Sequence, residues 1–228
     1  MCNHASCKGT IQRRHALALL GGTVAFGTGM VGWTLPALAD ARVVGGRLSL
    51  KRDAGGKLLR AKTDGSSGVL RTSDQLFYLD ADSDAEFTTA SDGKVTEILI
   101  KAGGVLSLFG PQGTQQTNII TPNAAGAIRG TTTYFAWQAA EQRTYVCCCY
   151  GGVDLENGEG GGEKLRTSYH QAVILPKGGG VEAAPYPAPL NHYDDDISKL
   201  ESLVDRQPRW QLPGGKMNFF APQPVPVS

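Results

Sequence analysis

Three consecutive cysteines are the residues of this sequence most suited to chemistry. Cys147, Cys148 and Cys149 are the only cysteines beyond the first 39 residues, and His170 and His192 are the only histidines there. In a β-strand the first and third cysteines project from one face and the middle one from the other. Cys147 and Cys149 with the two histidines would supply two thiolates and two imidazoles, a donor set that suits tetrahedral Zn²⁺ or copper held by soft ligands.

Other interpretations of the same residues stay open. Adjacent cysteines bridge only with strained geometry and three thiols cannot all pair internally, so the triplet predicts no simple disulfide framework, although a thiol or disulfide redox role is an alternative. In a purely structural interpretation the cysteines are buried small hydrophobes and the histidines are surface or capping residues, because neither histidine has a fixed short spacing from another ligand. The run Asn191–Asp194 could add an oxygen ligand or an outer partner of a metal-bound histidine.

The sequence lacks three common enzyme signatures. It has no Gly-x-Ser-x-Gly, no glycine-rich phosphate loop and no His-Glu-x-x-His. The three aspartates from Asp194 to Asp196 fit the first turn of a helix better than a pair of acid and base groups. Thiol catalysis by Cys147 or Cys149 with His170 would need a cleft. We therefore expect a non-catalytic protein and keep a thiol-dependent enzyme as the less favoured possibility.

Short apolar segments separated by turn residues must position these groups. Val95–Lys101 and Val105–Phe109 lie on either side of a Gly-Gly pair, and Gly130–Trp137 and Arg143–Tyr150 follow them. Segments of this length between Gly, Pro, Asp and Ser are typical of strands and predict an all-β domain over residues 40–155.

The rest of the chain is predicted to be less regular. Residues 156–192 are rich in Gly and Pro and are expected to form irregular loops with one strand. Residues 193–210 carry Ile197 and Leu200 on one helical stripe, with acidic residues first and a proline near the end, which predicts a C-terminal helix. The proline-rich residues 211–228 are expected to form a flexible tail.

Residues 1–39 predict an export signal peptide. Arg13 and Arg14 precede the uncharged stretch Ala16–Trp33, and a small-x-small site predicts cleavage after Ala39. The paired arginines resemble a twin-arginine signal and predict a bacterial periplasmic or otherwise exported protein. An uncleaved membrane anchor is the alternative, because the apolar stretch is long enough to span a bilayer. After cleavage we expect no membrane span.

The charge balance argues against a nucleic-acid partner. The 228 residues include 22 Lys and Arg against 21 Asp and Glu. The leader contains three of the basic residues and no acidic one. Acidic side chains therefore slightly outnumber basic ones in the exported part. Phosphate binding by release of counterions needs an excess of basic side chains that this composition does not provide.

One segment resembles a known family. Thr121–Thr131 reads Thr-Pro-Asn-Ala-Ala-Gly-Ala-Ile-Arg-Gly-Thr, similar to the Thr-Pro-(six residues)-Arg-Gly-Thr signature of the FecR domain. The match covers roughly Gly65 to Leu155, with a Gly-Gly step before a strand at Gly103 and a Gly-x-Val strand after the signature. The resemblance implies a twisted, solenoid-like β-fold, so the expected fold class is a mainly β roll of short strands with a short C-terminal α-helix.

The resemblance also implies a role without catalysis. Only a short segment precedes the apolar stretch, so we expect a stand-alone exported FecR-like protein rather than a transmembrane regulator that holds a sigma factor. Such a protein would be a sensing, binding or scaffolding component of the bacterial envelope, with an envelope protein or a small ligand as partner. Arg129 could bind that ligand or a carboxylate, or could be structural. Tyr134 and Trp137 could form an aromatic ligand platform. A periplasmic metal-binding protein is the alternative function.

Overall fold

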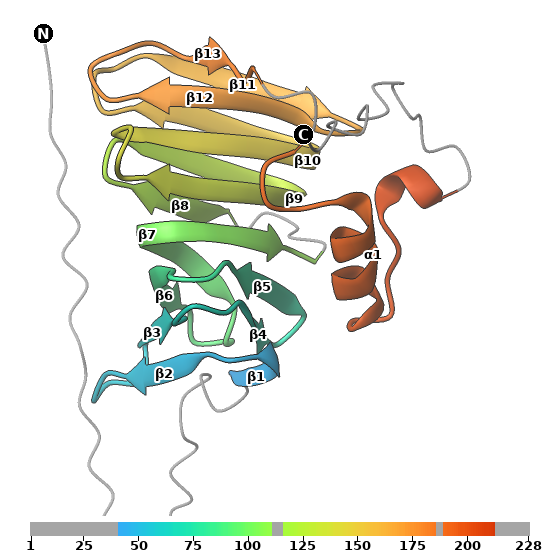
Figure 1. Ribbon diagram of the computed structural model, residues 1–228. Helices are drawn as coiled ribbons and strands as arrows, with labels where there is room; N and C mark the ends of the chain where they lie inside the picture. Colours follow the sequence, from blue (N-terminus) through green and yellow to red (C-terminus); the bar gives the residue numbers. More distant parts are fainter. Residues whose placement is uncertain (1–40, 111–115, 186–188, 213–228) are drawn as a thin grey trace, which may run out of the picture. The chain divides into compact units, whose positions relative to one another are not determined.

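The protein is mainly β, as the computed structural model shows for residues 41–110, 116–185 and 189–212 (Figure 1). These residues confirm the predicted mainly β fold and the C-terminal helix, whereas the solenoid-like arrangement is not confirmed. The described elements are β1 (Arg42–Gly46), β2 (Ser49–Arg52), β3 (Leu58–Lys62), β4 (Gly68–Thr72), β5 (Gln75–Leu79), β6 (Asp84–Thr89), β7 (Val95–Leu108), β8 (Thr117–Thr121), β9 (Ala124–Gln138), β10 (Arg143–Asn157), β11 (Gly162–Thr167), β12 (Gln171–Pro176), β13 (Glu182–Ala183), α1 (Asp194–Ser202) and a 3₁₀ turn (Arg209–Gln211).

Three strands are much longer than the sequence suggested. Two pairs of segments predicted as separate short strands merge into β7 and β10, which have 14 and 15 residues, and the predicted strand Gly130–Trp137 is part of β9, which has 15 residues. Each long strand contains a glycine with a positive φ, at Gly103 (+70°), Gly130 (+57°) and Gly151 (+98°). Glycine adopts this conformation without steric cost, so the strand changes direction there and continues. The expectation of short strands was wrong because these glycines were interpreted as strand ends.

The long strands belong to two groups of strands at once. The first half of β7 pairs with β6 and β8, and its second half pairs with β5 and β9. One group thus runs from β2 through β3, β6, β7, β8, β9 and β10 to β11, and the other from β1 through β4, β5, β7, β9 and β10 to β12 and β13. All pairings are antiparallel except that between β7 and β8.

Two hydrophobic clusters lie on opposite faces of the second group. Alternate residues of β10 separate cleanly, since Val146 and Cys148 belong to one cluster while Cys147 and Cys149 belong to the other. The first cluster, called here the inner core, contains residues from both groups of strands. The second, called here the helix-side core, also contains Ile197 of α1. The predicted alternation of the cysteine triplet is therefore confirmed.

Residues 156–192 are more regular than predicted. They contain β11, β12 and β13 instead of one strand, and β10 itself extends to Asn157. β11 and β12 both pair with β10, which the hydrophobic pattern of residues 156–192 does not reveal because β11 is largely exposed. The expectation of irregular loops with a single strand was therefore wrong.

The C-terminal helix is shorter than the predicted 193–210. α1 begins after Tyr193 and ends at Ser202, and the 3₁₀ turn follows separately. Asp194, Asp195 and Asp196 occupy the first turn as expected. Glu201 of α1 is almost completely buried. Its carboxylate is hydrogen-bonded to Tyr150 and Thr132 of the strands and paired with Arg206, and these contacts fix the helix against the strands.

Two predicted segments lie outside the described residues. The export signal with Arg13, Arg14 and the cleavage site after Ala39 is one, and the tail from residue 213 is the other. Of the helices in the described part, none has the length and hydropathy that crossing a membrane requires.

Candidate metal centre

The four predicted donor side chains come together on the helix side of β10. Cys147 and Cys149 project from that strand into the helix-side core, His170 lies between β11 and β12, and His192 precedes α1. One ligand atom from each of the four lies within 4.8 Å of the others. Cys148 points to the inner core and takes no part. The sequence-based selection of Cys147, Cys149, His170 and His192 therefore corresponds to one cluster in space.

Short strand connections place the cysteines and the first histidine. The hairpin of β9 and β10 turns within residues 139–142, and Cys147 is paired with Tyr134 across it. Backbone N–H of His170 donates to the Cys149 carbonyl at 2.9 Å, which holds the histidine beside the strand. The turn before it is closed by Thr167, whose hydroxyl accepts the Tyr169 N–H at 3.1 Å.

Each histidine presents one ring nitrogen to a cysteine and uses the other for a fixed partner. Nδ1 of His170 lies 3.3 Å from Sγ of Cys147, and Nε2 lies 2.9 Å from a carboxylate oxygen of Asp194. Nε2 of His192 lies 3.4 Å from Sγ of Cys149, and Nδ1 donates to the Leu190 carbonyl at 2.7 Å.

These outer partners decide which nitrogen can bind a metal. A carboxylate and a carbonyl only accept hydrogen bonds, so the outer nitrogens, Nε2 of His170 and Nδ1 of His192, carry protons. The inner nitrogens are then the ones available as ligands. Histidines that bind metals in proteins are oriented in this manner, by an outer carboxylate or carbonyl. The expectation that the run Asn191–Asp194 holds an outer partner agrees with the position of Asp194.

Aromatic rings complete the surroundings of the histidines. The ring of Tyr134 stacks on His192 with centroids 4.7 Å apart, and Trp210 lies 5.6 Å from His170. The Tyr169 hydroxyl donates to the other oxygen of Asp194 at 2.8 Å. Since both histidine rings are held on several sides, their ligand nitrogens need little reorganisation to bind an ion.

The protonation of the cluster is distributed unevenly. Burial raises the pKa of the Cys147 thiol, but its hydrogen bond with Cys149 and the neighbouring histidines outweigh burial and place the pKa well below the ordinary value. Burial and the hydrogen bond to Cys147 raise the pKa of Cys149. Burial lowers the pKa of His170, yet the hydrogen bonds with Asp194 and Cys147 dominate and bring it to about 9. A metal ion binding here would mainly displace the protons of the Cys149 sulfur and of Nδ1 of His170.

The contact of Cys147, His170 and Asp194 also has the order of a nucleophile, a base and an orienting carboxylate. A thiol nucleophile must meet a substrate, and the side chains of Cys147 and Cys149 have no exposed surface. The cleft that the sequence argument required for thiol catalysis is therefore not found at these sulfur atoms. In the described chain all three cysteines are free thiols, without a disulfide.

Arg129 lies apart from this cluster. Its side chain is 59% exposed and its Nε donates to Asp154 at 2.9 Å, on the first half of β9. Asp154 also pairs with Arg166, so the carboxylate bridges β9, β10 and β11. Of the alternatives considered for Arg129, the structure shows a carboxylate partner within the protein.

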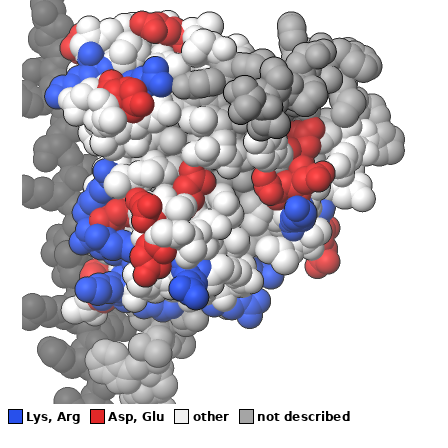
Figure 2. All heavy atoms as spheres, in the orientation of Figure 1, with Lys and Arg blue, Asp and Glu red and all other residues white. Residues whose placement is uncertain are grey.

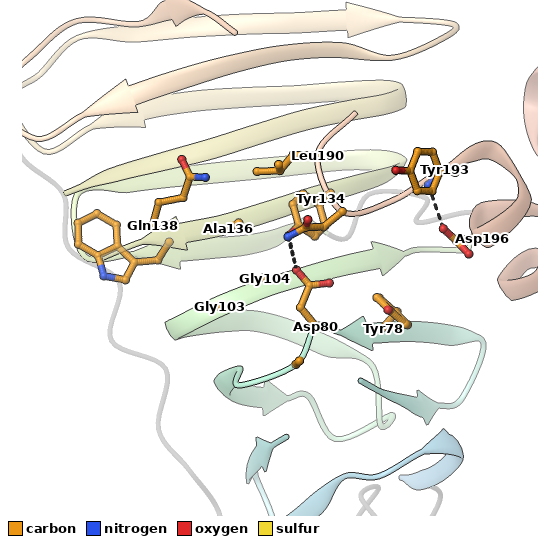
Figure 3. A pocket seen from close by; sticks show the side chains of 13 residues that line it. Tyr78, Asp80, Gly103, Gly104, Tyr134, Ala136, Gln138, Leu190, Tyr193 and Asp196 are labelled. Carbon is orange, nitrogen blue, oxygen red and sulfur yellow. Dashed lines mark hydrogen bonds between the residues drawn. The ribbon is translucent and has the colours of Figure 1, made fainter. Parts of the chain in front are cut away.

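Tyr134 and Trp137 line a groove next to the histidines (Figure 3). Tyr134 itself is buried, and its hydroxyl donates to Asp80. Trp137 is partly buried and packs against the inner core. Asp80, which also lines the groove, was missed by the sequence analysis. Asp80 lies 54 residues before Tyr134 in a turn rich in acidic residues, where no local pattern distinguishes it.

Comparisons with known proteins find distant structural similarity and no match of sequence. No protein-family model and no curated protein matches the sequence. Two crystal structures of a candidate anti-sigma factor from Parabacteroides distasonis ATCC 8503 resemble the chain, at 13% and 12% identity with TM-scores of 0.47 and 0.45. The similarity covers 56% and 55% of this chain and 59% and 58% of the matched chains, so this chain spans less than two thirds of their length.

Proposed function

We propose that this domain binds a single zinc ion through Cys147, Cys149, His170 and His192 and that the ion has a structural, non-catalytic role. The observation that carries the proposal is the convergence of four donor atoms within 4.8 Å, all on the helix side of β10. In a tetrahedral zinc site with ordinary bond lengths, sulfur and nitrogen ligands lie about 3.5 Å apart. The two sulfur–nitrogen separations of 3.3 and 3.4 Å are close to that value.

Charge favours zinc over copper. Two thiolates neutralise Zn²⁺, whereas Cu⁺ with the same ligands leaves one negative charge. The side chains of Cys147, Cys149 and His192 have no exposed surface, and an uncompensated charge is costly in such a place. Copper(I) is still the second choice, because thiolates are soft ligands and bind it well.

The full set of four protein ligands supports a structural role for the ion. Structural zinc ions have four protein ligands, while catalytic zinc ions keep one position for water or substrate. Here the protein supplies four ligands in a buried place, and one of them, His192, belongs to the segment that leads into α1. The ion would therefore fasten the C-terminal segment to β10.

The wider role that we propose is sensing, binding or scaffolding in the bacterial envelope. The leader with Arg13 and Arg14 supports export to the periplasm, and the segment Thr121–Thr131 supports a relation to the FecR domain. An envelope protein or a small ligand would be the partner. The zinc ion would keep the domain rigid for that interaction.

Metal analysis of the purified full chain tests the zinc proposal. We expect one zinc per chain, and with Co²⁺ in its place the intense near-ultraviolet absorption of cobalt–thiolate bonds. Cys149→Ser should abolish the stoichiometric binding. The matched control is Cys148→Ser, one residue away on the other face of β10, which should bind zinc normally. Metal-free protein that keeps its stability in the presence of a chelator would overturn the proposal, and preferential loading with Cu⁺ would replace zinc by copper.

A further inference from the structure

The groove beside the histidines has a floor of small residues and walls of aromatic ones. It has a volume of about 560 Å³, and Gly103, Gly104 and Ala136 of β7 and β9 form its floor. Tyr193 comes from the segment before α1 and Tyr78 from β5 (Figure 3). A Cβ atom at Gly104 would come within 2.6 Å of Asp80 and closer still to the Tyr134 hydroxyl, so glycine at this position is what allows the two side chains to meet.

Asp80 presents a carboxylate to the groove. One oxygen, Oδ2, accepts hydrogen bonds from the Tyr134 hydroxyl and, at 3.2 Å, from Nδ2 of Asn191. The other oxygen, Oδ1, accepts no hydrogen bond from any described residue, and in Figure 3 the carboxylate lies between Tyr134 and Tyr78. Burial is the main reason why the pKa of Asp80 is raised. A cation at Oδ1 would offset that cost of burial.

The charges around the groove have one sign. Asp80 and Asp196 are among its lining residues, and no described lining residue is a lysine or an arginine. Figure 2 shows acidic side chains in the middle of this face and beside α1. The aromatic residues Tyr78 and Tyr193 also line it, and the faces of such rings attract cations.

From these observations we propose that the groove binds an organic ammonium group, with Oδ1 of Asp80 as its hydrogen-bond acceptor and the aromatic rings around its alkyl part. The ammonium group belongs either to a free alkylamine or to a lysine side chain of a peptide. Anions are repelled by the two carboxylates. Neutral ligands such as sugars leave the carboxylate without a counter-charge.

The inference is independent of the zinc proposal, because neither Asp80 nor the aromatic residues are metal ligands. The groove is nevertheless next to His192, whose neighbours Asn191 and Tyr193 line it. Zinc content is therefore measured on every sample, so that a lost metal ion is not mistaken for a lost ammonium site.

Titration of the ¹⁵N-labelled full chain, followed by NMR, tests the proposal. The probes are n-butylammonium for a free amine and Nα-acetyl-lysine-N-methylamide for a peptide side chain, with butyrate, n-butanol and methyl β-glucoside as controls. We expect saturable shifts of the backbone amide signals of Gly103 and Gly104, which line the groove, from one or both ammonium probes and from none of the controls. Whichever ammonium probe binds more tightly identifies the source of the group.

Two variants locate the site. Asp80→Asn keeps the shape of the side chain and should weaken ammonium binding about tenfold or more, as loss of a charged hydrogen-bond partner does. The control Asp82→Asn removes the same charge two residues away, outside the groove lining, and should leave binding unchanged. Tyr193→Ala changes a side chain that is 63% exposed, so folding is preserved, and binding should fall about two- to fivefold through loss of a cation–π contact.

Three results would overturn the inference. The first is equal binding of n-butanol and n-butylammonium, and the second is unchanged binding by Asp80→Asn with normal zinc content. The third is absence of saturable shifts from both ammonium probes.

Discussion

The two hydrophobic cores of this domain differ in the aromatic residues they use. The buried rings of the inner core are all phenylalanines, at positions 77, 87, 109 and 135. Those of the helix-side core are Tyr134, Tyr145, Tyr150, Tyr169 and Trp210. The inner core is thus held by contacts without directional preference, while the helix-side core has a polar group on most of its rings.

The polar groups of the helix-side core attach a segment that is distant in sequence to the β-structure. The Tyr150 hydroxyl is hydrogen-bonded to Glu201, that of Tyr169 to Asp194, and that of Tyr145 accepts from the Leu190 N–H. In each case the partner lies in the C-terminal segment. Buried hydrogen bonds specify one arrangement, because a shifted segment would leave them unpaired. The proposed metal centre belongs to the same side and adds to this specificity.

Metal removal should give the largest difference in stability between the two cores, because only the helix-side core contains the proposed ion. Chelation of zinc should lower the free energy of unfolding by about 4 kcal/mol or more, as losses of structural metal ions do. Hydrogen exchange followed by mass spectrometry should show faster exchange in residues 190–203, while β3 and β6, which pair beside the inner core, stay protected. If protection from hydrogen exchange fell equally in both regions, the stability of the inner core would also depend on the metal ion.

Replacement of an outer hydrogen-bond partner of the metal centre should have the next largest effect. Asp194→Asn leaves His170 without its carboxylate, and zinc affinity should fall about 10- to 100-fold. Asp195→Asn is the matched control, because Asp195 occupies the same first turn of α1 but is exposed. Competition with a chromophoric chelator measures both affinities. If both variants lost affinity equally, a general charge effect would be responsible instead of the contact.

The middle cysteine should report on the inner core alone. Cys148→Ala removes a buried sulfur atom and should destabilise the domain by about 1 kcal/mol through a small cavity. Urea unfolding measures the change, and zinc content should stay at one ion per chain. A lower zinc content in this variant would contradict the separation of the two faces of β10.

A smaller effect of pH is expected on the strands beside the inner core. The hydrogen bond with Arg60, aided by Lys62, lowers the pKa of Asp84 to about 2. A depressed pKa in the folded state stabilises the fold above the ordinary carboxyl pKa, and this stability is lost as pH falls toward about 2. Unfolding curves of the wild type and Asp84→Asn should therefore differ at pH 6 and converge near the folded pKa.

A control for the pH effect is Arg60→Gln, which removes the main partner of the carboxylate but leaves Lys62, and should reduce the pH dependence less than Asp84→Asn does. If Arg60→Gln kept the full wild-type dependence, the contact with Arg60 would not be the main cause of the pH effect.

Much of the metal centre could be predicted from the sequence because its rules are local. The alternation of side chains along a strand placed Cys147 and Cys149 together and Cys148 apart. The histidines followed from their scarcity, since no others occur beyond the leader. The run that contains Asp194 could be predicted to hold an outer partner because it also contains His192.

The remainder depends on contacts that no local pattern encodes. Asp80 meets Tyr134 across 54 residues, and Glu201 meets Tyr150 across 51. β11 lacks a clear apolar face, so its pairing with β10 follows only from the path of the long strand. The continuation of β7, β9 and β10 through their glycines was missed because glycine ends strands about as readily as it bends them.

The hairpin of β9 and β10 has a consequence for the order of folding. Its strands are joined by a four-residue turn, and they pair from Gln138 and Arg143 to Ala124 and Asn157. Hairpins with short turns close within about 1–10 μs, whereas contacts across long loops form later. We therefore expect the two sulfur atoms to be in place early, His170 to join when β12 adds to the hairpin, and His192 to arrive last. Zinc would be captured by a nascent sheet, and its final coordination step would coincide with the docking of the helix.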